Sequence, residues 1–523
     1  MMRLLLKGLG LFVLIACLVW LGVLWRWQVT RHDMSIEDVV LYLALLPLGL
    51  FVFVLLARWA WRGAVARADL REAHARAVTE PVAEPLPPAD AARHATCQVL
   101  AATLHCAAAT NARELLQAVE EGKPRPSLDR HLRRADGLPT ITARVAAADE
   151  AGVADALATA LERLCLRRPE FLGRDPGGRL QRALGLLRPV LADALAALSP
   201  WRVALGGQVG ESADTGSVPG FAAADTRSQV AAHATRRAPG PPQPPAVRVL
   251  VAWPEGTDEF GRELARQWLA DTLRSQGEGT VAPERWRVHA QAVGAGPELL
   301  LEADRLLHDQ RRLGCGDLLL VAACHSDLDA PTVLRLDDAG ALFGTATPRG
   351  RLPGEAAVAL VLADAGWPAD PLADRPPPHL HRPGVGQRGK SIDAPGRISS
   401  DLAVELLQHA IAAARLDAAQ ALALATDADQ HTPRGPELFG ATLAELPHLD
   451  ATEDLRMAGP LCGHLGPCGA LVSVAMAAQH AADTGQPCLA LSVADTVWRA
   501  AAVARPAPPA AAEAAPRTSP TAA

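Results

Sequence analysis

Apolar runs alternate with amphipathic segments along most of the chain, and this alternation predicts an α/β fold with largely parallel sheets. Continuous apolar runs predict buried strands over Cys97–Leu104, Val247–Trp253, Asp317–Ala323, Ala356–Leu362 and Ala421–Ala425. Helical spacing predicts helices over Asn111–Glu121, Leu180–Leu198, Gly261–Leu273, Pro297–Leu313, Leu402–Leu416 and Ala470–Thr484. The last apolar segments, Cys488–Val493 and Thr496–Val503, predict a closing hairpin.

Two uncharged apolar runs near the N-terminus predict a transmembrane hairpin in residues 1–65. The runs cover about residues 9–25 and 39–57, and each is about long enough to span the hydrocarbon core. A signal peptide is the alternative for the first run, but no small-residue cleavage site follows it and a second run does. Arginines follow the second run, so the positive-inside rule predicts that both ends of the chain are cytoplasmic.

Segments rich in charged residues or in Pro, Gly, Ala or Ser divide the remaining chain, and the insertion among them cannot bury much apolar surface. They are a charged helix and Pro-rich linker at 66–94, a disordered insertion at 206–246, a Pro/Gly loop at 376–396 and a disordered tail at 505–523. The parts left for a folded domain are 95–205 and 247–375, which form its first half, and 397–504, which forms its second half.

Composition narrows the classes of partner. A net charge of −6 without a basic stripe interleaved with aromatic residues gives no signal for nucleic-acid binding. The 9 cysteines are an odd number without framework spacing, which argues against a disulfide scaffold and favours a reducing compartment.

A glycine-rich loop with a histidine, Gly463-His-Leu-Gly-Pro-Cys-Gly469, comes directly before an alanine-rich helix. Other segments, in order, are ATNARELLQAVEEGK, GRDPGGRLQRALGLLRPVLADAL, LGCGDLLLVAA, LPGEAAVALVL and SSDLAVELLQHAIAAARLDAAQALALATDAD. Together they resemble the β-ketoacyl synthase branch of the thiolase superfamily over about residues 95–503. The resemblance implies a thiolase-like five-layered αβαβα sandwich built from two related halves, and it implies a homodimer.

A condensing enzyme needs a thiolate at the N-terminus of a buried helix and two imidazoles that face the sulfur. The family's spacing places the nucleophile near Gly296–Glu298, where this chain has Pro297 and Glu298. No cysteine lies between Cys165 and Cys315. A proline or a carboxylate cannot form the acyl thioester, so we expect that condensation has been lost.

The histidine positions of the family are also altered. The first histidine should stand near Thr426, but the nearest one, His431, comes five residues later. Glu437 falls where the family has an acidic residue, and His464 matches the second histidine. We therefore expect no catalytic residue and no cofactor, and treat these positions as a degenerate site: Pro297, Glu298, Thr426, His431, Glu437 and His464.

Two further groups of residues have competing interpretations. Cys324 and His325 could be a displaced nucleophile and base, but neighbours on a strand point to opposite faces, so a core thiol and a loop histidine are favoured. Cys462, His464 and Cys468 have the spacing of a metal half-site, but zinc needs further ligands and no motif supplies them. We expect no metal site.

The combined features predict a non-catalytic binding platform or adapter on the cytoplasmic face of a bacterial inner membrane, with protein partners and the lipid bilayer. Membrane-anchored relatives of this kind resemble accessory and adapter proteins of type VI secretion loci. One alternative is an acyltransferase or thioester hydrolase that uses a relocated residue, such as Cys324, Glu298 or His464. Another is a structural subunit of a membrane complex that interacts through its hairpin.

Overall fold

The computed structural model describes Trp25 and residues 92–146, 148–207, 245–289, 294–345, 347–368, 370, 373, 375–431 and 434–507. The predicted hairpin apart from Trp25, most of the insertion at 206–246 and most of the tail at 505–523 lie outside these residues. None of the helices described has the length and apolar character needed to cross a bilayer. The chain divides into two units, Met1–Glu84 and Pro85–Ala523, and the fold below is that of the second.

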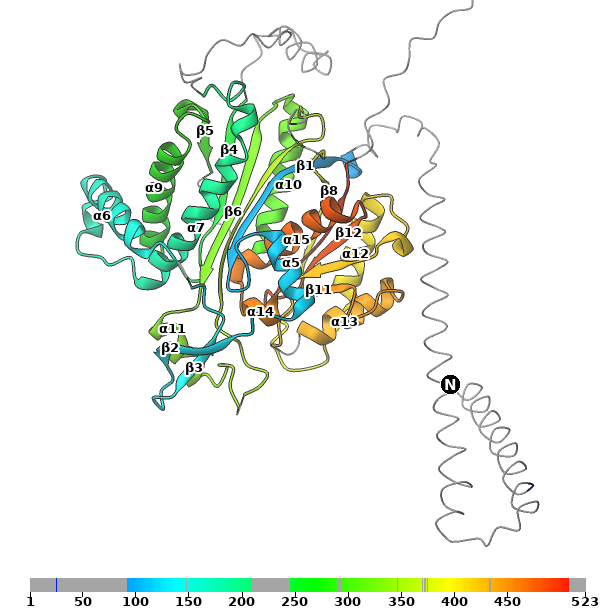
Figure 1. The fold of residues 1–523 in the computed structure, drawn as a ribbon. Coiled ribbons are helices and arrows are strands. Elements are labelled where there is room, and N and C mark those ends of the chain that lie inside the picture. Colours follow the sequence, from blue (N-terminus) through cyan, green and yellow to red (C-terminus); the bar gives the residue numbers. More distant parts are fainter. Residues whose placement is uncertain are drawn as a thin grey trace, which may run out of the picture. The chain divides into compact units, whose positions relative to one another are not determined.

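A mixed sheet of 11 strands runs through this unit (Figure 1). Its strand order is β11-β10-β12-β13-β8-β1-β7-β6-β4-β5, and β9 pairs with β13 beside this path. The bounds are β1 Thr96–Cys106, β4 Val247–Ala252, β5 Trp286–Val288, β6 Leu318–Ser326, β7 Glu355–Asp364, β8 His379–His381, β9 Gly384–Gln387, β10 Leu424–Thr426, β11 Leu455–Met457, β12 Cys488–Ser492 and β13 Trp498–Arg505. A separate hairpin joins β2 Ser127–Arg133 to β3 Pro139–Thr142.

The prediction of largely parallel sheets is wrong for the middle of this sheet. Strand β7 is antiparallel to both β1 and β6, and β12 is antiparallel to β13. The parallel pairings are the outer ones, between β4 and its neighbours β5 and β6, and between β10 and its neighbours β11 and β12. A parallel pair needs a crossover of a dozen or more residues, and the short turn from β12 to β13 allows only an antiparallel return.

The helices have the bounds α5 Ala112–Glu121, α6 Glu150–Arg167, α7 Gly178–Ala196, α9 Glu259–Gln276, α10 Gly296–Leu313, α11 Ala330–Asp338, α12 Asp401–Ala413, α13 Arg434–Glu445, α14 Gly459–Cys462 and α15 Gly469–Thr484. Local sequence explains their ends. Asn111 caps α5 by accepting a hydrogen bond from the backbone N–H of Glu114. Helix α10 has Pro297 in its first turn and ends at Gly314, which is left-handed at φ 66.

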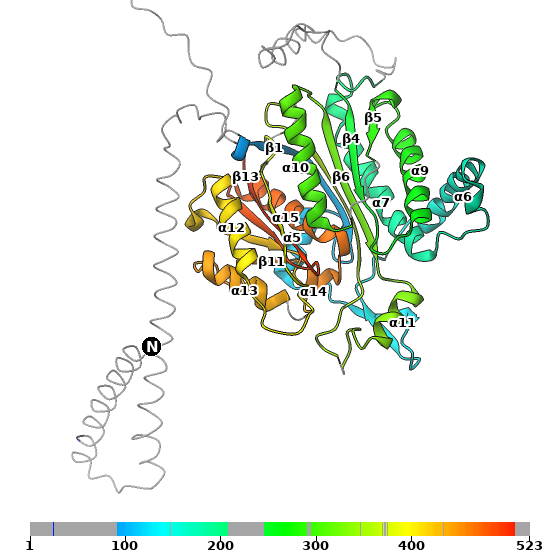
Figure 2. The same cartoon turned by 180° about the vertical axis from the view of Figure 1, so that it is seen from behind.

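Helices and sheet halves alternate in five layers (Figures 1 and 2). On one side, α7 and α9 form the outer layer, with α7 packed on β1, β6 and β7. On the other side, α12 packs on β9 and β13 with α13 against it. Helices α10 and α15 lie between the sheet halves, because α10 contacts β4, β6, β9 and β13 and α15 contacts β1, β7, β10, β12 and β13. Separate apolar cores fill the spaces between these layers. The predicted αβαβα layering is thus confirmed.

The two halves repeat one topology. The order β5-β4-β6-β7 in the first half corresponds to β11-β10-β12-β13 in the second half. In each half two pairings are parallel and the last is antiparallel. Helix α10 precedes β6 as α15 precedes β12, so the two middle-layer helices occupy equivalent places. The prediction of two related halves is confirmed by this order of strands and helices.

Each strand and helix predicted after residue 94 is found, with shifts of a few residues at the ends. Residues 66–91 of the predicted charged helix and Pro-rich linker lie outside the described residues. The sequence analysis missed the β2–β3 hairpin, the short strands β5, β8, β9 and β11, and helices α6, α11, α13 and α14. Strands β8 and β9 lie within the segment 376–396 that was predicted as a Pro/Gly loop. Helix α11 packs on β2, and both lie outside the five layers with their own small core around Val333. Helix α6 packs on α7 and α9, so it extends an outer layer.

A buried ion pair joins three of these elements. Arg182 of α7 donates to both carboxylate oxygens of Glu355 at the start of β7, at 2.6 and 2.7 Å. Glu355 also accepts hydrogen bonds from the Ser326 hydroxyl at the end of β6, at 3.0 Å, and from the Val145 N–H, at 2.7 Å. The Glu355 side chain is 0% exposed, so its charge depends on these donors.

We expect Arg182→Met to lower the free energy of unfolding by about 3–5 kcal/mol, because it leaves the Glu355 carboxylate buried without its cation. Urea unfolding of the full chain, followed by circular dichroism, measures this loss. Arg266→Met is the matched control, because Arg266 forms a pair with Glu263 at the surface and should cost less than about 1 kcal/mol. Equal losses in the two variants would contradict the prediction.

A buried histidine–aspartate cluster as the candidate functional site

Three potential metal-ligating side chains meet at the end of β6, where the first half of the domain meets the loop that precedes α15. They are His325 in β6, Asp327 directly after it, and His464 in the loop. One donor atom from each lies within 4.8 Å of the other two, and all three residues are buried. Glu255, after β4, lies at the outer side of this cluster, with its Oε1 3.8 Å from Nε2 of His464.

Asp327 stands between the two imidazoles. Nδ1 of His464 lies 2.8 Å from Asp327 Oδ2 in a buried hydrogen bond. Nε2 of His325 lies 3.2 Å from Asp327 Oδ1, yet neither ring nitrogen of His325 makes a hydrogen bond, because the alignment is poor. The two rings are 5.0 Å apart between centroids and meet edge to face at 82°.

Backbone contacts and one arginine set the cluster in place. The Asp327 N–H donates to the carbonyl of Gly354, and the His464 N–H donates to that of Leu352. Arg179 of α7 donates to the carbonyls of Ser326 and Glu255, both at 2.6 Å, and its Nη2 lies 3.3 Å from Asp327 Oδ1. The guanidinium of Arg179 therefore forms hydrogen bonds with both the segment after β4 and the end of β6.

A glycine permits the approach of the histidine loop to the strand. Gly466 has φ +49, and a Cβ there would lie 2.4 Å from Nδ1 of His325. Such a distance is below any real carbon contact, so a side chain at this position would displace the His325 ring. The glycine pattern of the loop, from which the resemblance was first inferred, thus has a local steric cause.

Burial and mutual charge shape the protonation of the cluster. Burial lowers the pKa of the His325 imidazole below its usual value. Burial alone would raise the pKa of Asp327, but the charges of His325 and His464 outweigh it and hold that pKa well below its usual value. Burial also acts to raise the pKa of Glu255, and His464 and His325 again lower it overall. At neutral pH both carboxyl groups are therefore ionised.

The N-terminus of α10 lies against the same loop and carries no thiol. A Cβ on Gly296 would lie 2.6 Å from the carbonyl oxygen of Pro467 and 3.1 Å from Cβ of Ala470. Pro297 is buried in the first turn. Glu298 accepts a hydrogen bond from the Gly294 N–H at 3.1 Å. Of the three positions near which the family resemblance places the nucleophile, Gly296 is closely packed against backbone, and Pro297 and Glu298 occupy the other two.

Six of the eight cysteines in the described residues are buried, and Cys165 and Cys315 are half-buried. Cys324 belongs to the core under α7, on the face of β6 opposite to His325, as strand alternation predicted. Its pKa is raised by burial. Cys462 and Cys468 belong to the middle core, and the Cys468 thiol donates to the carbonyl of Ala356 at 3.3 Å. No hydrogen bond joins any thiol to His325 or His464 in the part of the chain that the structure describes.

The structure brings His325 and Asp327 together with His464. These donors are not those of the half-site considered at Cys462, His464 and Cys468. The interpretation of His325 as a loop histidine is wrong. It is the eighth residue of β6 and is fully buried, because the strand continues to Ser326.

Other predicted positions are structural. Thr426 is buried at the end of β10, and its hydroxyl accepts a hydrogen bond from the Ala428 N–H. Glu437 is buried and accepts hydrogen bonds from Arg499 and Arg388. His431 lies outside the cluster, with its Nδ1 3.8 Å from Asp393 Oδ1.

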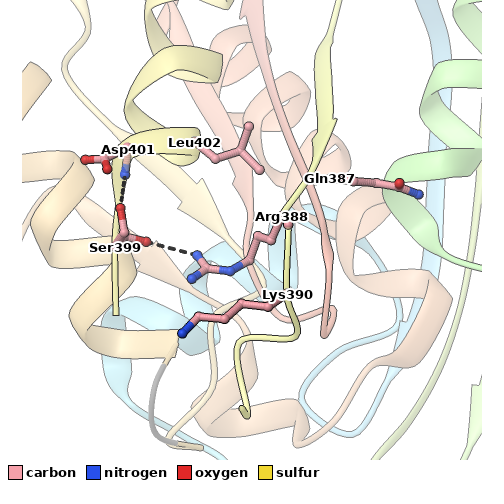
Figure 3. A pocket seen from close by; sticks show the side chains of 7 residues that line it. Gln387, Arg388, Lys390, Ser399, Asp401 and Leu402 are labelled. Atoms are coloured by element: carbon pink, nitrogen blue, oxygen red, sulfur yellow. Dashed lines mark hydrogen bonds between the residues drawn. The ribbon is translucent and has the colours of Figure 1, made fainter. Parts of the chain in front are cut away.

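A separate open hollow of about 470 Å³ lies beside β9 (Figure 3). Arg388 and Lys390 line it, together with Ser399, Asp401 and Leu402. Arg388 donates to the Ser399 carbonyl and to Glu437, so its charge is largely engaged. The hollow brings together none of the predicted site residues.

Sequence analysis found His464 but missed Asp327 and Glu255. A usable signal existed, because both residues follow apolar runs that were predicted as strands. Strands β4 and β6 are parallel neighbours, so residues after their carboxyl ends lie at one edge of the sheet. The same reasoning brings His325 to that edge once β6 is extended by three residues beyond Ala323.

No family model and no curated protein matches the chain. Several solved structures are similar to it. The ishigamide ketosynthase/chain length factor is 17% identical with a TM-score of 0.45, and the match covers 79% of this chain and 100% of that chain. Ketosynthases from the bacillaene synthases include module 1 of Bacillus amyloliquefaciens FZB42 (13% identity, TM-score 0.45, 81% of this chain and 78% of that chain). Module 6 of Bacillus subtilis 168 is 14% identical with a TM-score of 0.47, over 79% of this chain and 72% of that chain.

We expect Gly466→Ala to destabilise the protein by about 1–3 kcal/mol more than a glycine substitution with the same backbone strain, because its Cβ collides with His325. Gly485→Ala is the matched control. Gly485 follows α15 with φ +69, and a Cβ added there would meet no atom within 4 Å. The loss of stability in Gly485→Ala therefore measures only the cost of a left-handed backbone for alanine, which is about 1 kcal/mol. Thermal and urea unfolding of both variants measure the difference. A Gly466→Ala protein as stable as Gly485→Ala would contradict the close approach.

Proposed function

We propose that this chain is a ketosynthase-like protein that has lost condensation and acts as a binding platform or adapter. The observation that carries the proposal is the packing at Gly296, where backbone atoms of Pro467 fill the space that a nucleophilic side chain would need. A cysteine at position 296 could not be accommodated without moving the histidine loop. The next two positions are Pro297 and Glu298, so none of the three offers a thiol, which supports a role other than acyl transfer.

The family resemblance of the sequence and the two repeated halves support the ketosynthase-like part of the proposal. The apolar runs at about residues 9–25 and 39–57 support anchoring at the cytoplasmic face of a bacterial inner membrane, with the bilayer and other proteins as partners. A secretion-system locus and a homodimer are part of the same proposal. A rigid domain of this size offers a large surface for a protein partner.

We expect the purified full chain to form no acyl-enzyme. The test incubates it with acyl-coenzyme A and, separately, with a cerulenin-type inhibitor, and records the intact mass with peptide mapping of any adduct. No adduct is expected at Cys324 or Cys468, because both are buried and burial raises the pKa of both thiols. A working condensing enzyme under the same conditions is the positive control. Rapid acylation of one cysteine in this chain would overturn the proposal.

A second candidate is thioester hydrolysis, and the His464–Asp327 hydrogen bond favours it. A carboxylate that holds one nitrogen of an imidazole orients the other nitrogen as a general base for water. The other two residues considered as relocated catalysts are badly placed, because Cys324 faces the core under α7 and Glu298 accepts from its own helix start. Only His464 remains of the three.

We expect no hydrolysis of acyl thioesters above background if the adapter function holds. If hydrolysis occurs, His464→Asn should lower its rate by about 10²–10⁴-fold, which is the usual contribution of a general base. His448→Asn is the control, since His448 bonds to the carbonyl of Ala421 away from the cluster. Free-thiol release during the assay gives the rates. Activity that is lost in His464→Asn and kept in His448→Asn would replace the adapter by a hydrolase.

A further inference from the structure

We propose that His325, Asp327 and His464 form a site for a divalent transition-metal ion of the zinc class, with Glu255 adding negative charge beside His464 on the outer side of the site. Two imidazoles and a carboxylate are donors that suit such ions. The inference is independent of the proposed adapter function, because it rests on the donors alone. It also differs from the half-site considered at Cys462 and Cys468.

The spacing of the donors is close to what coordination requires. Zinc binds nitrogen and oxygen at about 2.0–2.2 Å, so tetrahedral ligand atoms stand roughly 3–3.5 Å apart. Here one donor atom from each residue lies within 4.8 Å of the others, and Asp327 oxygens already lie 3.2 and 2.8 Å from the imidazole nitrogens. Small rotations of the rings would bring the three donors onto one ion.

The second observation is an unsatisfied histidine. His325 is 0% exposed, and neither Nδ1 nor Nε2 makes a hydrogen bond. Asp327 Oδ1 lies 3.2 Å from Nε2 but is poorly aligned with it, and a buried imidazole without a well-formed hydrogen bond is costly, because it has given up its hydrogen bonds to water. Coordination through one ring nitrogen would use the lone pair that now faces no donor. No other group of three or more His, Cys, Asp or Glu with this geometry occurs among the described residues.

The surroundings fit a coordinated ion. Asp327 and Glu255 supply negative charge, and Arg179 fixes the chain beside both by donating to the carbonyls of Ser326 and Glu255. Ligating groups are commonly oriented in this way by a second set of hydrogen bonds. Glu255 is 39% exposed at its side chain, whereas Asp327 is 1% exposed. An ion could therefore enter from the Glu255 side.

A metal here would join the two halves of the domain. His325 and Asp327 belong to the first half, whereas His464 precedes α15 in the second half. An ion shared by them would hold the histidine loop against β6 and the start of α10. Because the folded state alone presents all the donors together, binding would raise the melting temperature.

Zinc binding by the full chain tests the proposal. The protein is stripped with a chelator, dialysed and titrated with Zn²⁺ alone in a calorimeter, with the metal content determined by elemental analysis and the melting temperature by circular dichroism. We expect one Zn²⁺ per chain and a higher melting temperature. His464→Asn and His325→Asn should each abolish stoichiometric binding, and Glu255→Gln should weaken it by about 10–100-fold.

His448→Asn is the matched control and should bind Zn²⁺ like the wild type, because His448 is hydrogen-bonded to the carbonyl of Ala421, away from the cluster. Glu255→Gln changes a partly exposed side chain, so this variant should fold. It therefore tests the proposal even if a variant of a buried histidine does not fold. Co²⁺ substitution adds a check on the ligands, since a thiolate ligand would add a charge-transfer band in the near ultraviolet. Sub-stoichiometric binding, unchanged binding in His464→Asn and Glu255→Gln, or a thiolate band would each overturn the proposal.

Discussion

Two arginines one helical turn apart, Arg179 and Arg182 of α7, hold the end of the sheet on which the site depends. Arg182 pairs with the buried carboxylate of Glu355, and that carboxylate also accepts from Ser326 at the end of β6. Arg179 reaches the carbonyls that follow β4 and β6. A buried carboxylate without donors is strongly unfavourable. The hydrogen bonds of the two arginines therefore fix the positions of α7, the ends of β4 and β6, and the start of β7 relative to one another. The histidine–aspartate cluster is positioned by that arrangement.

The middle layer imposes the second constraint, because the starts of α10 and α15 meet with backbone almost in contact. Gly296 lies against the Pro467 carbonyl, Gly466 against the His325 ring and Gly469 against the Asp427 carboxylate. Asp427 in turn is held by the Ser492 hydroxyl and two backbone N–H groups. The close approach of the two helix starts leaves no room for a side chain at position 296 of α10. The next two positions of α10 are occupied by Pro297 and Glu298, neither of which carries a thiol.

Much of the fold could be predicted because it depends on local patterns. Apolar runs set the buried strands, and caps such as Asn111 and Gly314 set helix ends. The direction of the central strands could not be predicted in this way, since it depends on how β7 returns beside β1 and β6 across large sequence distances. The β2–β3 hairpin was missed because its strands are mostly exposed and lack a clear apolar run.

The candidate site was only partly predictable for a related reason. His464 lies in a loop with a recognisable glycine pattern, whereas Asp327 and Glu255 have no local motif. Their meeting depends on the parallel pairing of β4 and β6, and on the arginine from α7 that bonds to both segments. His431 and Glu437 come from family spacing, but Glu437 is paired with Arg499 and His431 lies 3.8 Å from Asp393, so neither joins the cluster. Spacing along the sequence does not predict which segments meet in the folded chain.

The gradient of exposure across the cluster indicates how a ligand would approach it. Glu255 is partly exposed and faces Arg351, whose Nη1 lies 3.7 Å from its Oε2. His464 is 7% exposed at its side chain, and His325 behind it is 0% exposed. A ligand would therefore meet the Glu255–Arg351 pair first and the two imidazoles last. Because His464 alone among these residues comes from the second half, any occupant that reaches it also bridges the halves of the domain.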